Sequence, residues 1–204
     1  YWMTNAEALP IEIAEEDGLR ADMYDFIASL LRTEPSDELI AQVALLQGDK
    51  TPIGSACLTL AHLAKTLDNG LIRNEYVSLF IGVGRGEILP FASYYLTGFL
   101  NDKPLAKLRS DMSAIGIRRA EGVKEPEDHI AFLCETMHGL ITGGLGSGVG
   151  LAGQQNFFRK HIAPWAVRFF EDLEGAEAAT LYMPIGTVGK IFLAIEAEAF
   201  EMAA

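Results

Sequence analysis

Apolar residues recur at every third or fourth position along most of this chain of 204 residues. Between residues 15 and 32, for example, Leu19, Met23 and Phe26 begin an apolar stripe that continues to Leu31. This spacing predicts amphipathic helices, because a half-buried strand would alternate at every second residue instead. No run of alternating β-branched residues occurs in the sequence. We therefore expect an all-α fold, a single-chain helical bundle of roughly nine to ten helices.

Residues that begin and end helices divide this pattern into segments. Ser36 and Thr51 are typical N-cap residues, and Pro52 suits the first turn that follows Thr51. Gly48 and Gly116 mark helix ends. The expected helices cover residues 15–32, 36–48, 51–67, 69–81, 102–116, 125–142, 157–161, 164–173 and 176–203.

The domain organisation follows from the same pattern. Residues 1–14 are acidic and lack an apolar signal core, so we expect a partly disordered N-terminal extension. Residues 15–204 are expected to form one helical domain. The segment 117–126 (IRRAEGVKEP) lacks helical spacing and predicts a hinge between sub-domains 15–116 and 126–204.

Charge and cysteine content limit the classes of partner. Lys and Arg total 16 against 28 acids, and the net charge of −12 argues against binding nucleic acid. An acidic surface suits a soluble protein and could attract a cationic peptide. The two cysteines, Cys57 and Cys134, form no motif of metal-ligand spacing, which favours a reducing cytoplasm. The most apolar late segment, Leu181–Ile195, is too short to span a membrane.

The stretch Glu75–Tyr95 (EYVSLFIGVGRGEILPFASYY) combines aromatic residues with three closely spaced glycines. Glycines allow positive φ and close backbone approach, and aromatic side chains are favoured anchors for another chain. A phosphate-binding loop is the alternative for these glycines and for Gly143–Gly150. Neither loop follows an expected strand or ends in the Gly-Lys-Ser/Thr of such loops, so flexible turns are favoured.

Three further sequence patterns are candidates for catalytic, metal-binding or signal motifs. Glu135 and His138 have the spacing of a di-iron ligand pair, but no second such pair occurs. A hydrolase would need a nucleophile elbow on a strand, and spacing alone cannot place Cys134 or Ser93 beside His129. Arg118-Arg119 indicates a solvated pair near a helix end. None of these patterns supports catalysis.

The segment Glu125–His129 (EPEDH) has two interpretations. As structure it is a helix start, with Pro126 in the first turn and acids at the positive end of the helix dipole. As a binding site, Asp128 could pair with a guanidinium while the ring of His129 accepts or donates a hydrogen bond. The residues alone leave both interpretations open.

Four segments together resemble the TorD/DmsD/NarJ family of redox-enzyme maturation chaperones, which bind twin-arginine signals. They occur in the family's order, and the resemblance covers most of the chain from about Leu19 onward. The segments are EYVSLFIG (Glu75–Gly82), LPFASYYLTG (Leu89–Gly98), EPEDH (Glu125–His129) and HIAPWAVRFF (His161–Phe170).

This resemblance implies a TorD-like, all-helical cytoplasmic chaperone for a molybdopterin-containing oxidoreductase of the dimethyl-sulfoxide-reductase class. Such proteins bind the client's leader peptide, hold the apoprotein for cofactor insertion and delay its export. They are not enzymes, so no catalytic residue, metal or cofactor is implied. The oligomeric state is left open between a monomer and a domain-swapped dimer. The implied peptide-binding residues are Tyr76, Leu79, Phe80, Pro90, Ser93, Tyr94, Pro126, Asp128 and His129.

Two departures from the family pattern bear on the client. Tyr76 stands where DmsD-like members often carry tryptophan, and the GVGRGE segment (Gly82–Glu87) looks closer to TorD-type proteins with formate dehydrogenase-like partners. Two alternatives stay open. One is a helical protein that binds GTP weakly or hydrolyses it, and the other is a helical adaptor without a peptide cleft. The adaptor requires Tyr76, Phe80 and Tyr94 to be buried.

Overall fold

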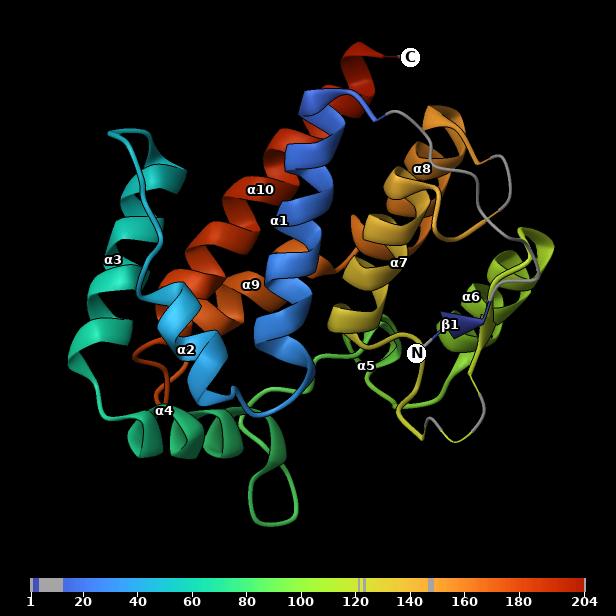
Figure 1. The fold of residues 1–204 in the computed structure, drawn as a ribbon. Coiled ribbons are helices and arrows are strands. Elements are labelled where there is room, and N and C mark those ends of the chain that lie inside the picture. Colours follow the sequence, from blue (N-terminus) through green and yellow to red (C-terminus); the bar gives the residue numbers. More distant parts are fainter. Residues whose placement is uncertain (1, 4–12, 121, 123, 147–148, 204) are drawn as a thin grey trace. The chain divides into compact units, whose positions relative to one another are not determined.

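The computed structural model describes residues 2–3, 13–120, 122, 124–146 and 149–203 (Figure 1). This part of the chain contains ten α-helices, two π-helical segments and one two-stranded antiparallel sheet, which confirms the all-α expectation. Residues 4–12 of the expected N-terminal extension lie outside the described residues. The elements are β1 (Trp2–Met3), α1 (Glu15–Arg32), α2 (Asp37–Val43), α3 (Pro52–Thr66), α4 (Asn69–Tyr76), η1 (Val77–Ile81), α5 (Ala92–Thr97), α6 (Lys103–Ala114), β2 (Arg118–Arg119), α7 (Ile130–Thr142), α8 (Leu151–Phe157), η2 (Phe158–Ile162), α9 (Ala166–Glu174) and α10 (Tyr182–Met202).

The expected caps begin several of these helices. Oγ of Ser36 accepts the N–H of Leu39 at 3.2 Å at the start of α2. Oγ1 of Thr51 accepts the N–H of Gly54 at 3.1 Å, with Pro52 in the first turn of α3. These bonds satisfy N–H groups that have no partner within the helix.

Three expected helix boundaries are wrong, and a helix was missed. The helix expected from residue 125 begins only at Ile130, because the ring of His129 accepts the N–H of Ala131 at 3.1 Å and acts as the N-cap. The second helix ends at Val43 and not near residue 48, and α10 begins at Tyr182 and not at residue 176. Helix α5 was not expected, since its six residues are too few to show a helical period.

The chain forms two compact units, each built from segments that are separate in sequence. Unit 1 contains Tyr1–Ala28 and Phe91–Trp165, and unit 2 contains Ser29–Pro90 and Ala166–Ala204. These boundaries differ from the proposed sub-domains 15–116 and 126–204. The proposed hinge segment 117–126 lies wholly inside unit 1, and its residues 121 and 123 lie outside the described part.

Unit 1 is organised around α7. Ten residues of α7 are buried, including Phe132, Met137 and Leu140, so the helix is apolar on almost every side. Helix α7 packs on α8 and η2, and α5 packs on α6. A helix that is apolar all round belongs in a core. These contacts fix η2 and the start of α7 within one unit.

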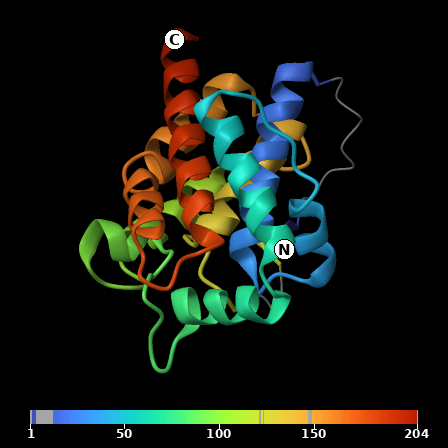
Figure 2. The same cartoon turned by 90° about the vertical axis from the view of Figure 1, so that its left-hand side faces the viewer.

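Unit 2 is organised around α10, which packs on α9 and α3 (Figure 2). The close approach of α9 and α10 depends on glycine. A Cβ at Gly189 would lie 2.3 Å from the ring of Phe170, and one at Gly186 would lie 2.7 Å from the Phe170 carbonyl oxygen. Larger residues at these two positions would separate the helices.

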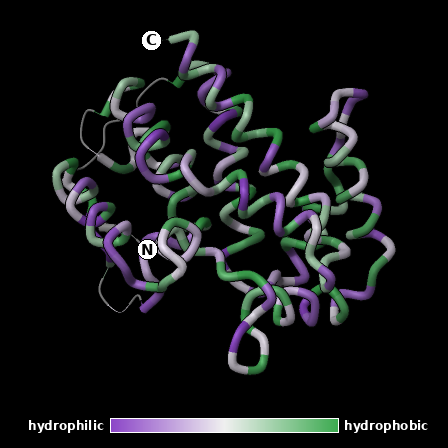
Figure 3. Tube along the Cα trace, turned by 180° about the vertical axis from the view of Figure 1, so that it is seen from behind, coloured by the Kyte–Doolittle hydropathy of each residue, from purple (hydrophilic) through white to green (hydrophobic). Residues whose placement is uncertain are grey.

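Hydrophilic and hydrophobic residues are interleaved along the helices (Figure 3). Among the described residues, none of the helices has the length and apolar character needed to cross a membrane. The interleaving is that of helices with one buried face.

Candidate functional site

The aromatic residues predicted for an apolar wall lie in unit 2, on α4 and η1. The ring of Tyr76 lies 5.0 Å from that of Phe80, and Tyr182 lies 6.0 Å and 5.5 Å from these two rings. Tyr76 and Leu79 are buried, whereas Phe80 is half-buried. Pro90, the fourth predicted residue in this unit, is buried. Phe80 is therefore the member of this set that another chain can reach.

The glycines after η1 allow the chain to turn back on itself. Gly82 ends η1 with φ of 60°, a value that disfavours other residues. The N–H of Ile88 then bonds the carbonyl oxygen of Leu79 at 2.8 Å. A Cβ at Gly86 would lie 2.5 Å from the backbone of Phe80. This tight return accounts for these two glycines without a bound phosphate.

Glu75 has a structural role that was not predicted. Its Oε1 accepts the N–H groups of Thr180 and Tyr182 at 2.6 and 2.7 Å, and Oε2 accepts that of Leu181 at 3.1 Å. Glu75 thus satisfies the turn that begins α10. One signal was present in the sequence. Glu75 and the apolar Leu79 are four residues apart, so the acid falls on the buried face of the helix.

The predicted polar residues of unit 1 meet where α5 and α7 begin. The backbone carbonyl of Asp128 accepts the N–H of Ala92 at 3.0 Å, and Oδ2 accepts the N–H of Ser93 at 2.8 Å. Phe91 and His129 also form a β-bridge. Oδ1 of Asp128 is buried and has no hydrogen-bond partner. The segment therefore precedes α7 and caps it through His129, and it leaves one acceptor oxygen of Asp128 without a partner.

His129 lies in an apolar environment. Its ring lies 5.1 Å from that of Phe91 and 5.9 Å from that of Phe132. Burial lowers the pKa of His129 to about 3, so the ring is neutral near pH 7. Because Nδ1 accepts a backbone N–H, the neutral ring is also the form that the helix start requires. His129 serves here as a neutral cap.

Three further residues complete the predicted set and its surroundings. The carbonyl of Pro126 accepts the N–H of His129 at 3.2 Å, and the half-buried ring of Tyr94 lies 5.9 Å from that of Tyr95. The carboxylate of Glu127 accepts three hydrogen bonds of 2.7–3.1 Å from Arg109. Burial raises the pKa of Glu127, but these bonds outweigh it and leave the pKa below its usual value.

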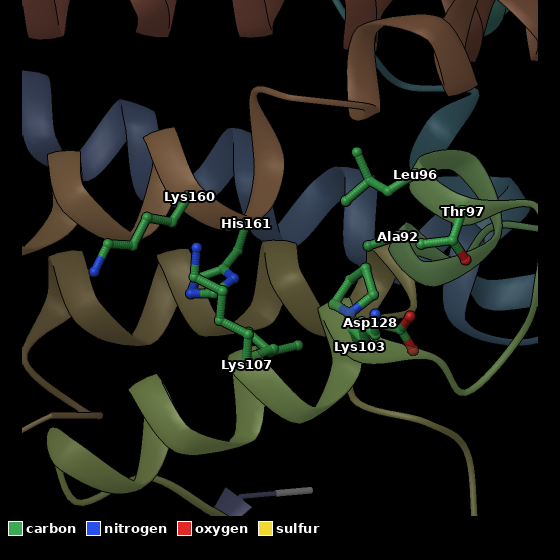
Figure 4. Close-up of a pocket in the computed structure, with 10 residues that line it drawn as sticks. Ala92, Leu96, Thr97, Lys103, Lys107, Asp128, Lys160 and His161 are labelled. Carbon is green, nitrogen blue, oxygen red and sulfur yellow. The ribbon is translucent and has the colours of Figure 1, made fainter.

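A cavity of about 450 Å³ opens beside Asp128, between α5, α6 and η2 (Figure 4). Three lysines line it, Lys103 and Lys107 from α6 and Lys160 from η2. His161 also lines it and bonds Asp111 at 2.9 Å through Nε2. Sequence reasoning missed these lysines, because they belong to segments about fifty residues apart that only the fold joins.

The nine predicted residues thus fall into two sets. Ser93, Tyr94, Pro126, Asp128 and His129 belong to unit 1, and Tyr76, Leu79, Phe80 and Pro90 belong to unit 2. The segment η1 lies within one motif of the resemblance and the end of η2 overlaps another, and π-helical segments are frequent at functional sites.

The residues considered for other chemistry have structural roles. Nδ1 of His138 lies 3.0 Å from the carbonyl oxygen of Ala21, and Cys57 and Cys134 are buried, unpaired thiols. Burial raises the pKa of the Cys134 thiol far above its usual value, so it is a poor nucleophile. Within the described ranges no group of three or more His, Cys, Asp or Glu side chains is placed to hold a metal ion.

Comparison with known proteins identifies relatives over most of the chain. The chain is 26% identical to the chaperone protein TorD of Vibrio cholerae over 194 residues, which covers 85% of this chain and 88% of that protein. It is 23% identical to TorD of Colwellia psychrerythraea, covering 92% of this chain and 94% of the relative. These relatives are named as chaperones and not as enzymes, which confirms the expectation of a non-catalytic protein.

The fold also matches a solved structure. A protein of Archaeoglobus fulgidus assigned to redox enzyme maturation superposes with a TM-score of 0.55 at 20% identity, over 93% of this chain and 99% of that one. The sequence profile of the family described as nitrate reductase delta subunit matches residues 46–171, more than half of the chain. The chain therefore belongs to this family of TorD- and NarJ-type redox-enzyme maturation chaperones.

Proposed function

We propose that this protein is a cytoplasmic chaperone that binds the leader peptide of a molybdopterin-containing oxidoreductase of the dimethyl-sulfoxide-reductase class. It holds the apoprotein for cofactor insertion and delays twin-arginine export. The observation that carries the proposal is the relation to TorD chaperones over 85% of the chain. A formate dehydrogenase-like client follows from the resemblance of the GVGRGE segment.

The proposed leader contacts divide by chemistry. A twin-arginine leader has a cationic start followed by an apolar run. Phe80 and Tyr94 are half-buried aromatics suited to the apolar run, because such rings contribute large contact area. The open Oδ1 of Asp128 is an acceptor for a guanidinium. The net charge of −12 would speed the encounter with a cationic peptide.

Isothermal titration with twin-arginine leaders of molybdoenzymes of this class tests the proposal. We expect Phe80→Ala to weaken leader binding roughly tenfold, as loss of an aromatic anchor does. Leu45→Ala is the matched control, because Leu45 is 73% exposed and is not a proposed contact. Leu79 is less informative, since it is fully buried and its truncation would leave a cavity.

Two outcomes would contradict the proposal. The first is the absence of binding at tens of micromolar for every such leader tried, since peptide-binding modules usually reach that range. The second is equal binding by wild type, Phe80→Ala and Leu45→Ala, which would remove Phe80 from the site. Replacing both leader arginines by glutamine should weaken binding to wild type but not to Asp128→Asn.

A further inference from the structure

The cavity beside Asp128 carries a concentration of positive charge that the proposed leader contacts do not use. The whole chain has 16 Lys and Arg residues and a net charge of −12, yet three lysines line this one cavity. Among the described residues, Lys103 and Lys107 have no ion-pair partner, and Lys160 has only a long contact of 3.7 Å to Asp111. Like charges placed together without partners repel one another, so an anion would stabilise them.

Two of the three lysines lie toward one end of the cavity. Lys107 and Lys160 are drawn near His161, while Lys103 is drawn beside Asp128, toward α5 (Figure 4). Burial lowers the pKa of His161, the hydrogen bond and charge of Asp111 oppose this, and the two lysines lower it further. The cavity therefore has two cations at one end. At the other end Lys103 lies beside the carboxylate of Asp128, which is 1% exposed and has one oxygen without a partner.

Much of the remaining lining is apolar, and exposed apolar residues follow it in the chain. Ala92, Leu96 and Leu108 contribute apolar lining. Beyond Leu96, which is 43% exposed, Phe99 and Leu100 are 71% and 44% exposed. Exposed apolar residues that gather beside a cavity indicate a contact surface for another polypeptide.

We propose that this cavity binds an acidic segment of a partner polypeptide, with carboxylates of that segment at Lys103, Lys107 and Lys160. Apolar side chains of the same segment would lie on Leu96, Phe99 and Leu100. This inference goes beyond leader binding, because the cationic start of a leader supplies no anion for the lysines.

A free phosphate fits the site less well than a polypeptide. The N–H of Lys103 at the start of α6 already donates to Oδ1 of Asp102 at 2.7 Å, so this helix start offers a phosphate one donor fewer. A phosphate ion also makes no apolar contacts with the exposed apolar residues. The charges and the apolar surface together therefore favour an acidic, partly apolar polypeptide.

Fluorescence anisotropy with short labelled peptides tests this proposal on the full-length protein. One peptide interleaves glutamate with leucine and serine, and its counterpart carries glutamine in place of glutamate. We expect the glutamate peptide to bind roughly tenfold more tightly, with a preference that falls as the salt concentration rises. The double variant Lys103→Gln/Lys107→Gln should lose this preference.

The matched control is Lys50→Gln/Lys65→Gln, since both lysines are exposed and lie in unit 2. This control double variant removes the same amount of charge and should keep the preference for the glutamate peptide. If the cavity double variant does not fold, Lys160→Gln replaces it and should reduce the preference alone. Phe99→Ser should weaken both peptides equally, because it removes apolar contact and no charge.

Three results would overturn the proposal. Equal affinity for the two peptides would show that charge does not select the ligand. An equal loss of preference in the two double variants would assign the effect to net charge and not to the cavity. Displacement of the glutamate peptide by inorganic phosphate at a comparable concentration would identify a small-anion site. None of these results depends on leader binding, which Phe80→Ala tests separately.

Discussion

Each unit contains a buried carboxylate beside the start of a long helix. The two carboxylates differ in how many hydrogen bonds they accept. In unit 2, Glu75 is 8% exposed and accepts three backbone N–H groups at the start of α10. In unit 1, Asp128 is 1% exposed and accepts one N–H through Oδ2, while Oδ1 has no partner. Buried polar atoms in native proteins are nearly always paired, so the second case calls for an explanation.

The difference separates a structural role from a binding role. A carboxylate whose oxygens both accept hydrogen bonds is fixed and has little left to offer a ligand. One with an open oxygen is already desolvated, so a donor that reaches it meets a small further cost. Glu75 therefore belongs to the framework, and Asp128 is the better candidate for contact with a partner.

The largest effect is expected for Glu75→Gln. Glutamine keeps the shape but loses the charge, and it turns an NH₂ group toward backbone N–H donors. Because hydrogen bonds to charged groups are strong, we expect the free energy of unfolding to fall by about 2–4 kcal/mol. Urea denaturation measures it. Glu87→Gln is the matched control, since Glu87 also accepts two backbone N–H groups, at 2.6 and 3.0 Å, but is exposed. Equal losses would show that burial is irrelevant.

A pH-dependent effect is expected from His129. Its pKa is about 3 in the folded state against 6.5 normally, so the unfolded chain binds the proton first. The stability due to the neutral ring is complete above pH 6.5 and is lost as pH falls toward 3, by at most about 1.4 kcal/mol per pH unit.

His129→Asn isolates this contribution, because asparagine is a good N-cap and does not titrate. The free energy of unfolding, measured by urea denaturation at several pH values, should fall less steeply in acid for the variant. His62→Asn, at an exposed position in α3, should keep the wild-type slope. Parallel curves for wild type and His129→Asn would refute the assignment.

A smaller effect is expected for Arg109→Lys, beside the open carboxylate. Lysine cannot form the forked contact that Arg109 makes with Glu127, and Glu127 is buried. We expect a loss of about 1 kcal/mol in the free energy of unfolding. Arg73→Lys, in the exposed pair with Asp37, should cost less. A larger loss for Arg73→Lys than for Arg109→Lys would show that the forked contact of Arg109 with Glu127 does not contribute to stability.

The smallest effect is expected for Asp128→Asn. The amide oxygen can keep the bond from Ser93, and the NH₂ group replaces an oxygen that has no partner. We expect less than about 1 kcal/mol of change in the free energy of unfolding, in contrast to Glu75→Gln. Thermal and urea unfolding both measure it. A loss as large as that of Glu75→Gln would remove the distinction between the two carboxylates.

Local signals predicted much of the fold. Glu15–Arg32 and Pro52–Thr66 were placed correctly, because each has a long apolar period and, in the second case, a capping residue. The start of α7 was misplaced since Pro126 is a good first-turn residue, and only the fold shows that His129 provides the cap. The β-bridge between Phe91 and His129 joins residues far apart in sequence, so no local pattern predicts it.

The candidate site was predicted only in part. The EPEDH segment was identified as polar, and Asp128 does have an open acceptor. The burial of Leu79 and the donors around Glu75 depend on how α10 packs, which a single helix period does not reveal. The lysines of the cavity come from α6 and η2 and lack any shared motif.

The order in which the segments leave the ribosome has a consequence for this chain. Every segment of unit 1 has been synthesised once Trp165 is added, whereas unit 2 needs Ala166–Ala204. Until α10 emerges, α3 lacks one of its two main packing partners and Glu75 lacks its three donors. A nascent chain can therefore complete the unit with the lysine-lined cavity while the other unit still awaits its last helix.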